Sequence, residues 1–334
     1  MPGSGESSEA HSTASDSAGR ARGAGVEGAS FGPCDGLKVH RAEVRPGVEL
    51  AWWREGIGGK PLLLVHGWPE TKLIWERNVL PLAAAGFEVI VPDLRGFGDS
   101  EVAADGFQDL AAHSRDLEAL VRGTLGHSSC FAAGGDLGGG VVQDMSLRFP
   151  GLISRQVMFN TILPLLIDDY EKAGLPRQPT AEVRANAGYF ARQGKDADGL
   201  CGELGGPEAR ASYVESFYTE RGWAAAGAVP QADAARMARP FMNAEKFRDG
   251  LGNYESALGS RPLSEMPIFF EQNLTPTLVL YGPEDHVIPK EFPQMCEVAF
   301  PNRTGPELVE GAGHFLQWEA ADRFNQSAMK FLDR

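Results

Sequence analysis

The sequence predicts an α/β protein in which a mostly parallel central sheet is flanked by helices. Continuous apolar runs such as 61–65 and 277–281 are followed by histidine, glycine or proline, which is typical of strands covered on both faces. Helix-prone stretches such as 71–85 alternate with these runs, as in parallel sheets. A long helix-prone segment, 163–262, contains no buried strand, and we interpret it as an inserted helical cap.

The predicted elements can be followed along the chain in order. Two alternating segments rich in β-branched and aromatic residues come first, and we expect an antiparallel pair joined at Pro46 and Gly47. Buried strands and helices then alternate up to the cap, and the sheet resumes after it. The expected strands are 38–44, 48–53, 61–65, 87–91, 129–133, 154–159, 277–281 and 307–309, and the expected flanking helices include 71–85, 114–125 and 319–332.

The chain divides into four predicted segments. Residues 1–30 are almost entirely glycine, alanine, serine and charged residues, so they cannot bury enough apolar surface to offset the entropy of ordering them. We expect them to form a flexible tail of low complexity. Residues 31–162 and 263–334 form the two parts of the predicted α/β core, and 163–262 form the cap.

The composition excludes several classes of function. The chain has 334 residues with 31 basic and 45 acidic side chains, and its net charge of −14 would repel nucleic acid and anionic membranes. No apolar run approaches the roughly 18 residues that a membrane-spanning helix needs. The beginning of the chain lacks the basic start and apolar stretch of a secretory signal, so we expect a cytoplasmic protein. We expect it to be a monomer or a homodimer.

No metal or cofactor is expected. The four cysteines are widely spaced and form no CxxC pair, and no cluster of histidine, cysteine and carboxylate residues has the spacing of metal ligands.

The segment from Gly134 to Gly139 has the pattern GxDxGG, in which a strand turns sharply into a helix around Asp136. This pattern is typical of a nucleophile elbow, whose strained turn needs small neighbours such as Gly138. A flexible loop with an aspartate cap is the alternative interpretation. A serine at the apex would attack carbonyl groups, whereas a carboxylate is suited to displacing a leaving group from saturated carbon, which leaves an alkyl ester on the enzyme.

Two backbone N–H groups are candidate donors to an oxyanion. One belongs to Trp68, in the loop after strand 61–65, and the other to Leu137, directly after the proposed nucleophile. His66 precedes this loop, and we interpret it as structural rather than as a general base.

The order of the remaining polar residues favours a catalytic triad. Asp285 follows strand 277–281, and His314 stands among small residues before the last helix, so nucleophile, acid and histidine occur in the order expected for an elbow enzyme. Asp285 would orient the imidazole, and His314 would take a proton from the water that attacks the ester on Asp136. Glu284 and His286 remain alternatives for the acid and for an accessory base.

Three segments together resemble the α/β-hydrolase superfamily, in particular its branch of epoxide hydrolases and haloalkane dehalogenases. VHGWPE at 65–70 and PDLRGFGDS at 92–100 resemble segments of epoxide hydrolases. HFLQWE at 314–319 is similar to the stretch that carries the catalytic base in both groups. The resemblance runs from about Leu37 to the end of the chain and implies an α/β-hydrolase fold with a cap.

The resemblance implies hydrolysis of a small apolar epoxide by water to a vicinal diol. In the family two cap tyrosines protonate the alkoxide as the ring opens. Tyr254 resembles the second of them in its place before the acid strand, and Tyr189 is our candidate for the first, with Tyr170 behind it. The residues expected around the substrate are His66, Trp68, Pro69 and Phe315.

The sequence departs from the family pattern beside the nucleophile, where Leu137 replaces the usual aromatic residue. The stretch 138–140 is glycine where fluoroacetate dehalogenases carry arginines, and Trp68 stands where many haloalkane dehalogenases have asparagine. An organohalide therefore remains the alternative substrate, with Trp68 or Trp223 as the halide donor. The third hypothesis is a small-molecule receptor that has kept the fold and lost turnover.

Overall fold

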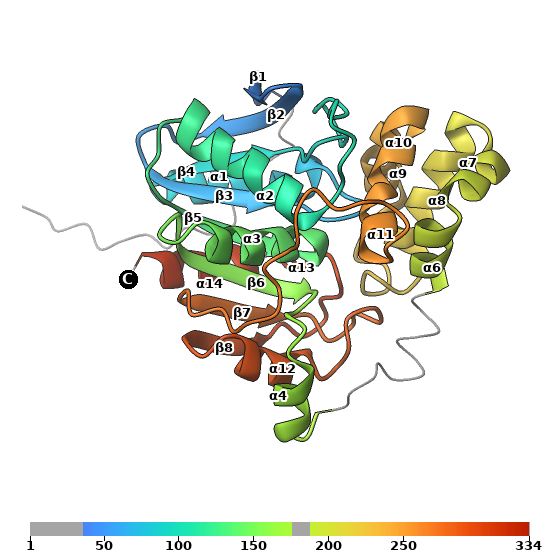
Figure 1. Ribbon diagram of the computed structural model, residues 1–334. Coiled ribbons are helices and arrows are strands. Elements are labelled where there is room, and N and C mark those ends of the chain that lie inside the picture. Colours follow the sequence, from blue (N-terminus) through green and yellow to red (C-terminus); the bar gives the residue numbers. More distant parts are fainter. Residues whose placement is uncertain (1–35, 176–187, 334) are drawn as a thin grey trace, which may run out of the picture. The chain divides into compact units, whose positions relative to one another are not determined.

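An eight-stranded sheet forms the centre of the computed structural model, which describes residues 36–175 and 188–333 (Figure 1). The predicted tail, 1–30, lies outside the described residues. The strand order is β1-β2-β4-β3-β5-β6-β7-β8. The strands are β1 (Val39–Arg45), β2 (Val48–Glu55), β3 (Lys60–Val65), β4 (Phe87–Pro92), β5 (Cys130–Gly135), β6 (Ile153–Thr161), β7 (Thr277–Tyr281) and β8 (Arg303–Leu308).

The sheet is mostly parallel, as predicted. Strands β3 to β8 pair in parallel, and only the pairs β1–β2 and β2–β4 are antiparallel. Every residue of β4 and β7 is buried, which explains why these strands are continuous apolar runs. Because six strands run in one direction, the loops that follow them meet at one edge of the sheet, where ligands bind in α/β proteins.

Helices flank the sheet. Helix α1 packs against α14, and α2 packs against α3. No helix in the described part of the chain is long and apolar enough to cross a membrane. The flanking helices are α1 (Glu76–Ala84), α2 (Leu110–Glu118), α3 (Asp136–Arg148), α12 (Phe292–Ala299), α13 (Leu316–Glu319) and α14 (Ala321–Leu332), with a short 3₁₀ turn η1 (Lys72–Trp75) and a π-helical turn η2 (Ala119–Thr124).

Between β6 and β7 the described residues contain helices and no strand. In Figure 1 helices α6 to α11 gather at the end of the sheet toward which β6 points. We call the stretch 163–262 the cap segment. Its described helices are α4 (Ile167–Lys172), α6 (Gly188–Lys195), α7 (Ala197–Leu204), α8 (Pro207–Thr219), α9 (Gln231–Ala238), η3 (Arg239–Met242), α10 (Ala244–Gly250) and α11 (Gly252–Ala257).

Several predicted boundaries were wrong, for identifiable reasons. Helix α2 begins at Leu110 instead of 114, because the Asp109 side chain accepts a hydrogen bond from the Ala112 N–H (2.9 Å) and caps it. The predicted helix 71–85 is divided into η1 and α1. The predicted strand 307–309 is instead β8, which includes the turn-like pair Gly305 and Pro306 and tolerates proline because it is an edge strand.

Candidate active site

Asp136 stands at the apex of the turn that joins β5 to α3. Its φ of +46° is left-handed, which is rare for a residue other than glycine. The turn brings the backbone of α3 against β3, because a Cβ on Gly138 would lie 2.3 Å from the Val65 carbonyl oxygen. A Cβ on Gly134 would meet the Gly138 carbonyl carbon at 2.6 Å. The turn therefore requires glycine at both positions.

His314 lies between the two predicted carboxylates. Its Nδ1 contacts Asp285 Oδ2 at 2.8 Å, and its Nε2 lies 3.3 Å from Asp136 Oδ2. The side chains of His314 and Asp285 are fully buried, whereas that of Asp136 keeps 16% of its surface accessible, so an incoming molecule can reach it. The 3.3 Å contact is not aligned as a hydrogen bond, and Nε2 has no hydrogen-bond partner among the described residues.

The two carboxylates control the protonation of His314. Burial alone would lower the pKa of the imidazole, but Asp285 and Asp136 outweigh burial and raise the pKa of His314 well above its usual value. The two carboxylates therefore favour the protonated form of the ring.

Asp285 is fixed by four hydrogen bonds. Its Oδ1 accepts from the backbone N–H groups of Val287 (2.7 Å) and Ile288 (3.0 Å). Its Oδ2 accepts from His314 and also from the amide of Asn160 (2.8 Å). Sequence reasoning missed Asn160, although its place at the end of β6, on the same edge of the sheet, was a usable signal.

Glu284 and His286 were the alternative candidates in this loop. The side chains of Glu284 and His286 are exposed, and the structure brings only Asp285 of this loop into contact with His314.

A backbone donor contacts the second oxygen of Asp136. The Trp68 N–H donates to Asp136 Oδ1 (2.7 Å), so Oδ1 and Oδ2 differ in their surroundings. Leu137 is the second residue of α3, where the backbone N–H has no partner within the helix. The predicted Trp68 donor therefore contacts the Asp136 carboxylate, and the Leu137 N–H at the start of α3 stays a prediction.

His66 uses both ring nitrogens within the protein. Its Nδ1 contacts the Gly67 carbonyl (2.8 Å), and its Nε2 accepts from the Leu94 N–H (2.9 Å), an arrangement that assigns the proton to Nδ1. Burial lowers the pKa of His66 and keeps it neutral. The residue orders the loop and offers no ring nitrogen to a substrate.

Tyr254 and Tyr189 both pack against the Trp68 ring, Tyr254 edge-on and Tyr189 parallel to it. The centroid of Trp68 is 5.3 Å from that of Tyr254 and 6.4 Å from that of Tyr189, and the two tyrosine rings are 5.9 Å apart. Burial, then Tyr189 and the charge of Asp136, raise the pKa of Tyr254 well above its usual value. Burial and the charges of Asp136 and Asp285 do the same for Tyr189. Both phenols therefore keep their protons and lie within electrostatic reach of Asp136.

Tyr170 is not part of this group, because its hydroxyl donates to the Pro164 carbonyl (2.9 Å). Pro69 accepts at its carbonyl from the Tyr218 hydroxyl (2.6 Å), which connects the HGWP loop to α8. The Phe315 ring stacks on Tyr218 with centroids 4.6 Å apart. Tyr218 was not predicted, since a cap tyrosine that bonds to backbone has no sequence signature.

Glu70 is a buried acid beside the site. It was not among the predicted site residues. It accepts from the Gly67 N–H and from the Gln317 side chain (3.0 Å). Burial and the charge of Asp136 raise the pKa of Glu70 to about 7. Its position directly after HGWP was the available signal.

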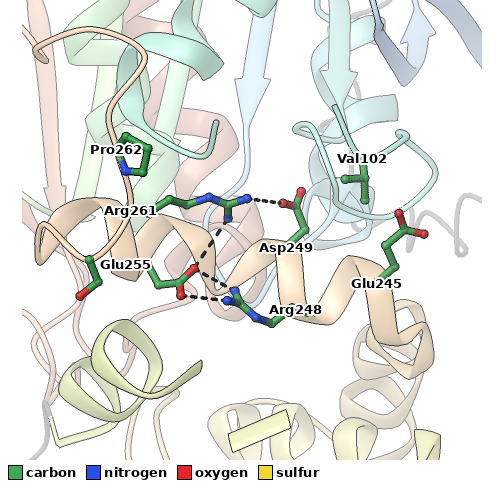
Figure 2. A pocket seen from close by; sticks show the side chains of 8 residues that line it. Val102, Glu245, Arg248, Asp249, Glu255, Arg261 and Pro262 are labelled. Carbon is green, nitrogen blue, oxygen red and sulfur yellow. Dashed lines mark hydrogen bonds and ion pairs between the residues drawn. The ribbon is translucent and has the colours of Figure 1, made fainter. Parts of the chain in front are cut away.

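Figure 2 shows a cavity of about 490 Å³ whose lining does not include Asp136, Asp285 or His314. Its charged side chains largely pair with one another: Arg248 binds Glu255 through two bonds of 2.8 and 2.9 Å, and Arg261 lies 3.4 Å from Asp249. Asp249 also accepts from Gln108, so this cluster connects α10 to the core. None of the residues that line it belongs to the predicted site.

Comparison with known proteins shows the family of the chain. A family model for the alpha/beta hydrolase fold matches residues 60–321. The chain belongs to the α/β-hydrolase fold family and is an enzyme of that family. Both the predicted fold and the resemblance stated above are thereby confirmed.

Individual relatives are named as epoxide hydrolases. The chain is 36% identical over 288 residues to the soluble epoxide hydrolase of Corynebacterium sp. (strain C12), covering 82% of this chain and 90% of that protein. It is 24% identical over 293 residues to epoxide hydrolase 4 of Mus musculus, covering 86% of this chain and 77% of that protein. The solved structure of the epoxide hydrolase CorEH without ligand superposes with a TM-score of 0.75 at 23% identity, covering 89% of this chain and 99% of that one.

Proposed function

We propose that the protein hydrolyses a small apolar epoxide to a vicinal diol through a covalent ester on Asp136. The observation that carries this proposal is the carboxylate at the elbow, with one oxygen on a backbone N–H (2.7 Å) and the other facing His314 (3.3 Å). The names of the relatives support the same activity.

In the first step Asp136 Oδ2 attacks one epoxide carbon. A new C–O bond forms, the C–O bond of the epoxide ring breaks, and its electron pair stays on the epoxide oxygen. Tyr254 or Tyr189 donates a proton to that oxygen, since burial keeps both phenols protonated. The product is an alkyl ester of Asp136 that carries a neighbouring hydroxyl group.

The tyrosinate then takes the resting proton of His314, because esterification has removed the charge of Asp136 that favoured it. In the second step the neutral His314 takes a proton from water at Nε2, and the water oxygen attacks the ester carbonyl carbon of Asp136. The developing oxyanion on Oδ1 accepts from the N–H of Trp68 and Leu137. When the tetrahedral intermediate collapses, the diol leaves and the carboxylate is restored. His314 keeps the proton taken from water, which restores its protonated resting form, so the cycle balances without a cofactor.

Aromatic side chains of the cap segment determine the class of substrate that we propose for the site. Trp68 contacts rings of Tyr189, Phe217, Trp223 and Tyr254 from the cap segment. This aromatic wall favours an apolar epoxide. We further propose that residues 163–262 act as the lid of the site.

A turnover assay on two substrate panels tests the proposal. Styrene oxide and related epoxides form one panel, bromoalkanes and haloacetates the other, and Asp136→Ala is the blank. Diol formation that disappears in the blank is the expected result. Halide release without diol would replace the proposal with a dehalogenase that uses the same triad, and binding without turnover of either panel would favour a receptor.

A further inference from the structure

Three backbone N–H groups converge on the carboxylate of Glu319. Its Oε2 accepts from Gly313 (2.8 Å) and from Ala225 (2.8 Å), and its Oε1 accepts from Phe315 (2.8 Å). Gly313 and Phe315 flank His314, so the carboxylate holds the chain on both sides of the proposed base.

The third donor comes from the cap segment. Ala225 belongs to a loop that also carries Trp223, whose carbonyl accepts from the His314 N–H (2.8 Å). The Trp223 ring packs on the edge of the imidazole with centroids 4.6 Å apart. A Cβ on Gly313 would lie 2.5 Å from the Trp223 carbonyl oxygen, so the two loops touch along their backbones.

We propose that Glu319 is a positioning residue that ties the His314 loop to the Trp223 loop and thereby aims the base at the water that hydrolyses the ester. This inference depends on the proposed function, in which His314 acts on the ester. Glu319 therefore controls ester hydrolysis and leaves ester formation unchanged, because the attack by Asp136 and the proton from the cap tyrosines use none of its contacts.

The chemistry of the group explains why a carboxylate is needed. All three neighbours are donors, so both oxygens must accept, and only an ionised carboxylate offers two acceptors. Glutamine has one acceptor, and its NH₂ group would face either Phe315 or the pair of Gly313 and Ala225. At least one of the three bonds must break, and the loop that carries His314 loses its restraint.

Glu319→Gln tests the proposal when both steps are timed separately. Rapid mixing with styrene oxide, followed by acid quench and mass spectrometry, gives the rate of ester formation and the steady-state fraction of protein that carries the ester. We expect unchanged ester formation, hydrolysis slower by about 10- to 100-fold, and accumulation of the ester.

Asn325→Ala is the matched control. Asn325 lies on α14 and makes a buried hydrogen bond with Asn78 (2.9 Å), so its loss destabilises the same region without contacting the His314 loop. We expect this control to leave the ratio of the two rates unchanged. Equal slowing of both steps in Glu319→Gln, or the same ratio in both variants, would overturn the proposal.

Two further measurements keep the test decisive. If Glu319→Gln does not fold, Glu319→Asp retains the charge but is one methylene shorter, and it must slow hydrolysis selectively for the proposal to stand. The wild-type protein is measured first. A wild-type protein that forms no ester overturns the proposed function itself, a result distinct from selective or unselective slowing in the variants.

Discussion

At the scale of single residues, the position of His314 between two carboxylates makes its basicity depend on the stage of the proposed reaction. Before the reaction both carboxylates raise the pKa of the ring. Esterification removes the charge of Asp136, so the pKa of His314 falls and the ring can release its resting proton before it accepts one from water. Loss of the Asp136 charge therefore makes His314 ready for ester hydrolysis only after the ester has formed.

Tyr254→Phe removes a proposed proton donor while keeping the ring that packs on Trp68 (5.3 Å). We expect epoxide opening to slow by about 10²-fold or more, because an alkoxide without its acid is a poor leaving group. Ester formation from a bromoalkane, if it occurs, should be unchanged, because halide needs no proton. Tyr170→Phe, which loses only a bond to the Pro164 carbonyl, is the control. An equal loss of the rate of ester formation with the epoxide and with the bromoalkane would show that Tyr254 acts only through packing.

The raised pKa of Glu70 predicts that the free energy of unfolding depends on pH. Its pKa rises from 4.5 to about 7 on folding, so between these values the folded protein binds a proton that the unfolded chain has released. The contribution to stability is full below pH 4.5 and is lost as pH rises to about 7. In Glu70→Gln the free energy of unfolding should therefore change less across this window, by on the order of 1–3 kcal/mol.

Urea unfolding at the two ends of that window measures this difference. The exposed Glu310, changed to glutamine, is the control, and it should follow the wild-type pH dependence. Parallel curves for wild type and Glu70→Gln would show that Glu70 does not titrate in this range.

At the scale of elements, the turn from β5 to α3 is the feature on which the site depends. In Gly138→Ala the new methyl group would meet the Val65 carbonyl oxygen at 2.3 Å, and neither backbone segment can give way cheaply. We expect a loss of about 1–3 kcal/mol in unfolding free energy and of most activity, because the turn that aims Asp136 is displaced. Thermal unfolding measures the loss of stability, and a turnover assay measures the loss of activity.

Gly123→Ala is the matched control, since Gly123 is exposed in η2 and a Cβ there meets nothing within 4 Å. It should be neutral or stabilising by about 0.4–1 kcal/mol. Similar losses in both variants would contradict the argument from close approach.

Elements with strong local patterns were predictable, and those defined by context were not. Strands β4 and β7 are buried on both faces, so their apolar runs identify them. Strand β8 lies at the sheet edge and contains Pro306, and its composition resembles a turn. Helix α12 was missed, because its eight residues include a proline and carry no lysine or arginine near the end.

At the scale of the whole molecule, the grouping of Asp136, Asp285 and His314 could be predicted because the topology brings them together. Asp136, Asp285 and His314 each follow a parallel strand, and the loops after parallel strands meet at one edge of the sheet. Asn160 escaped prediction because its hydrogen bonds join it to residues far along the chain. Glu319 escaped prediction because all its partners are backbone N–H groups, which leave no pattern in the sequence. The placement of the tyrosines depends on how the cap segment packs, which local sequence patterns do not encode.

The most direct test of the proposed cycle is the mass of His314→Gln after exposure to styrene oxide. This variant retains Asp136 and both cap tyrosines but lacks the base, so the ester should form and persist. Peptide mass spectrometry should place the added mass of one substrate on Asp136, and a variant that also carries Asp136→Ala should show none. Unchanged turnover by His314→Gln with no mass added to Asp136 would contradict the covalent cycle proposed for this enzyme.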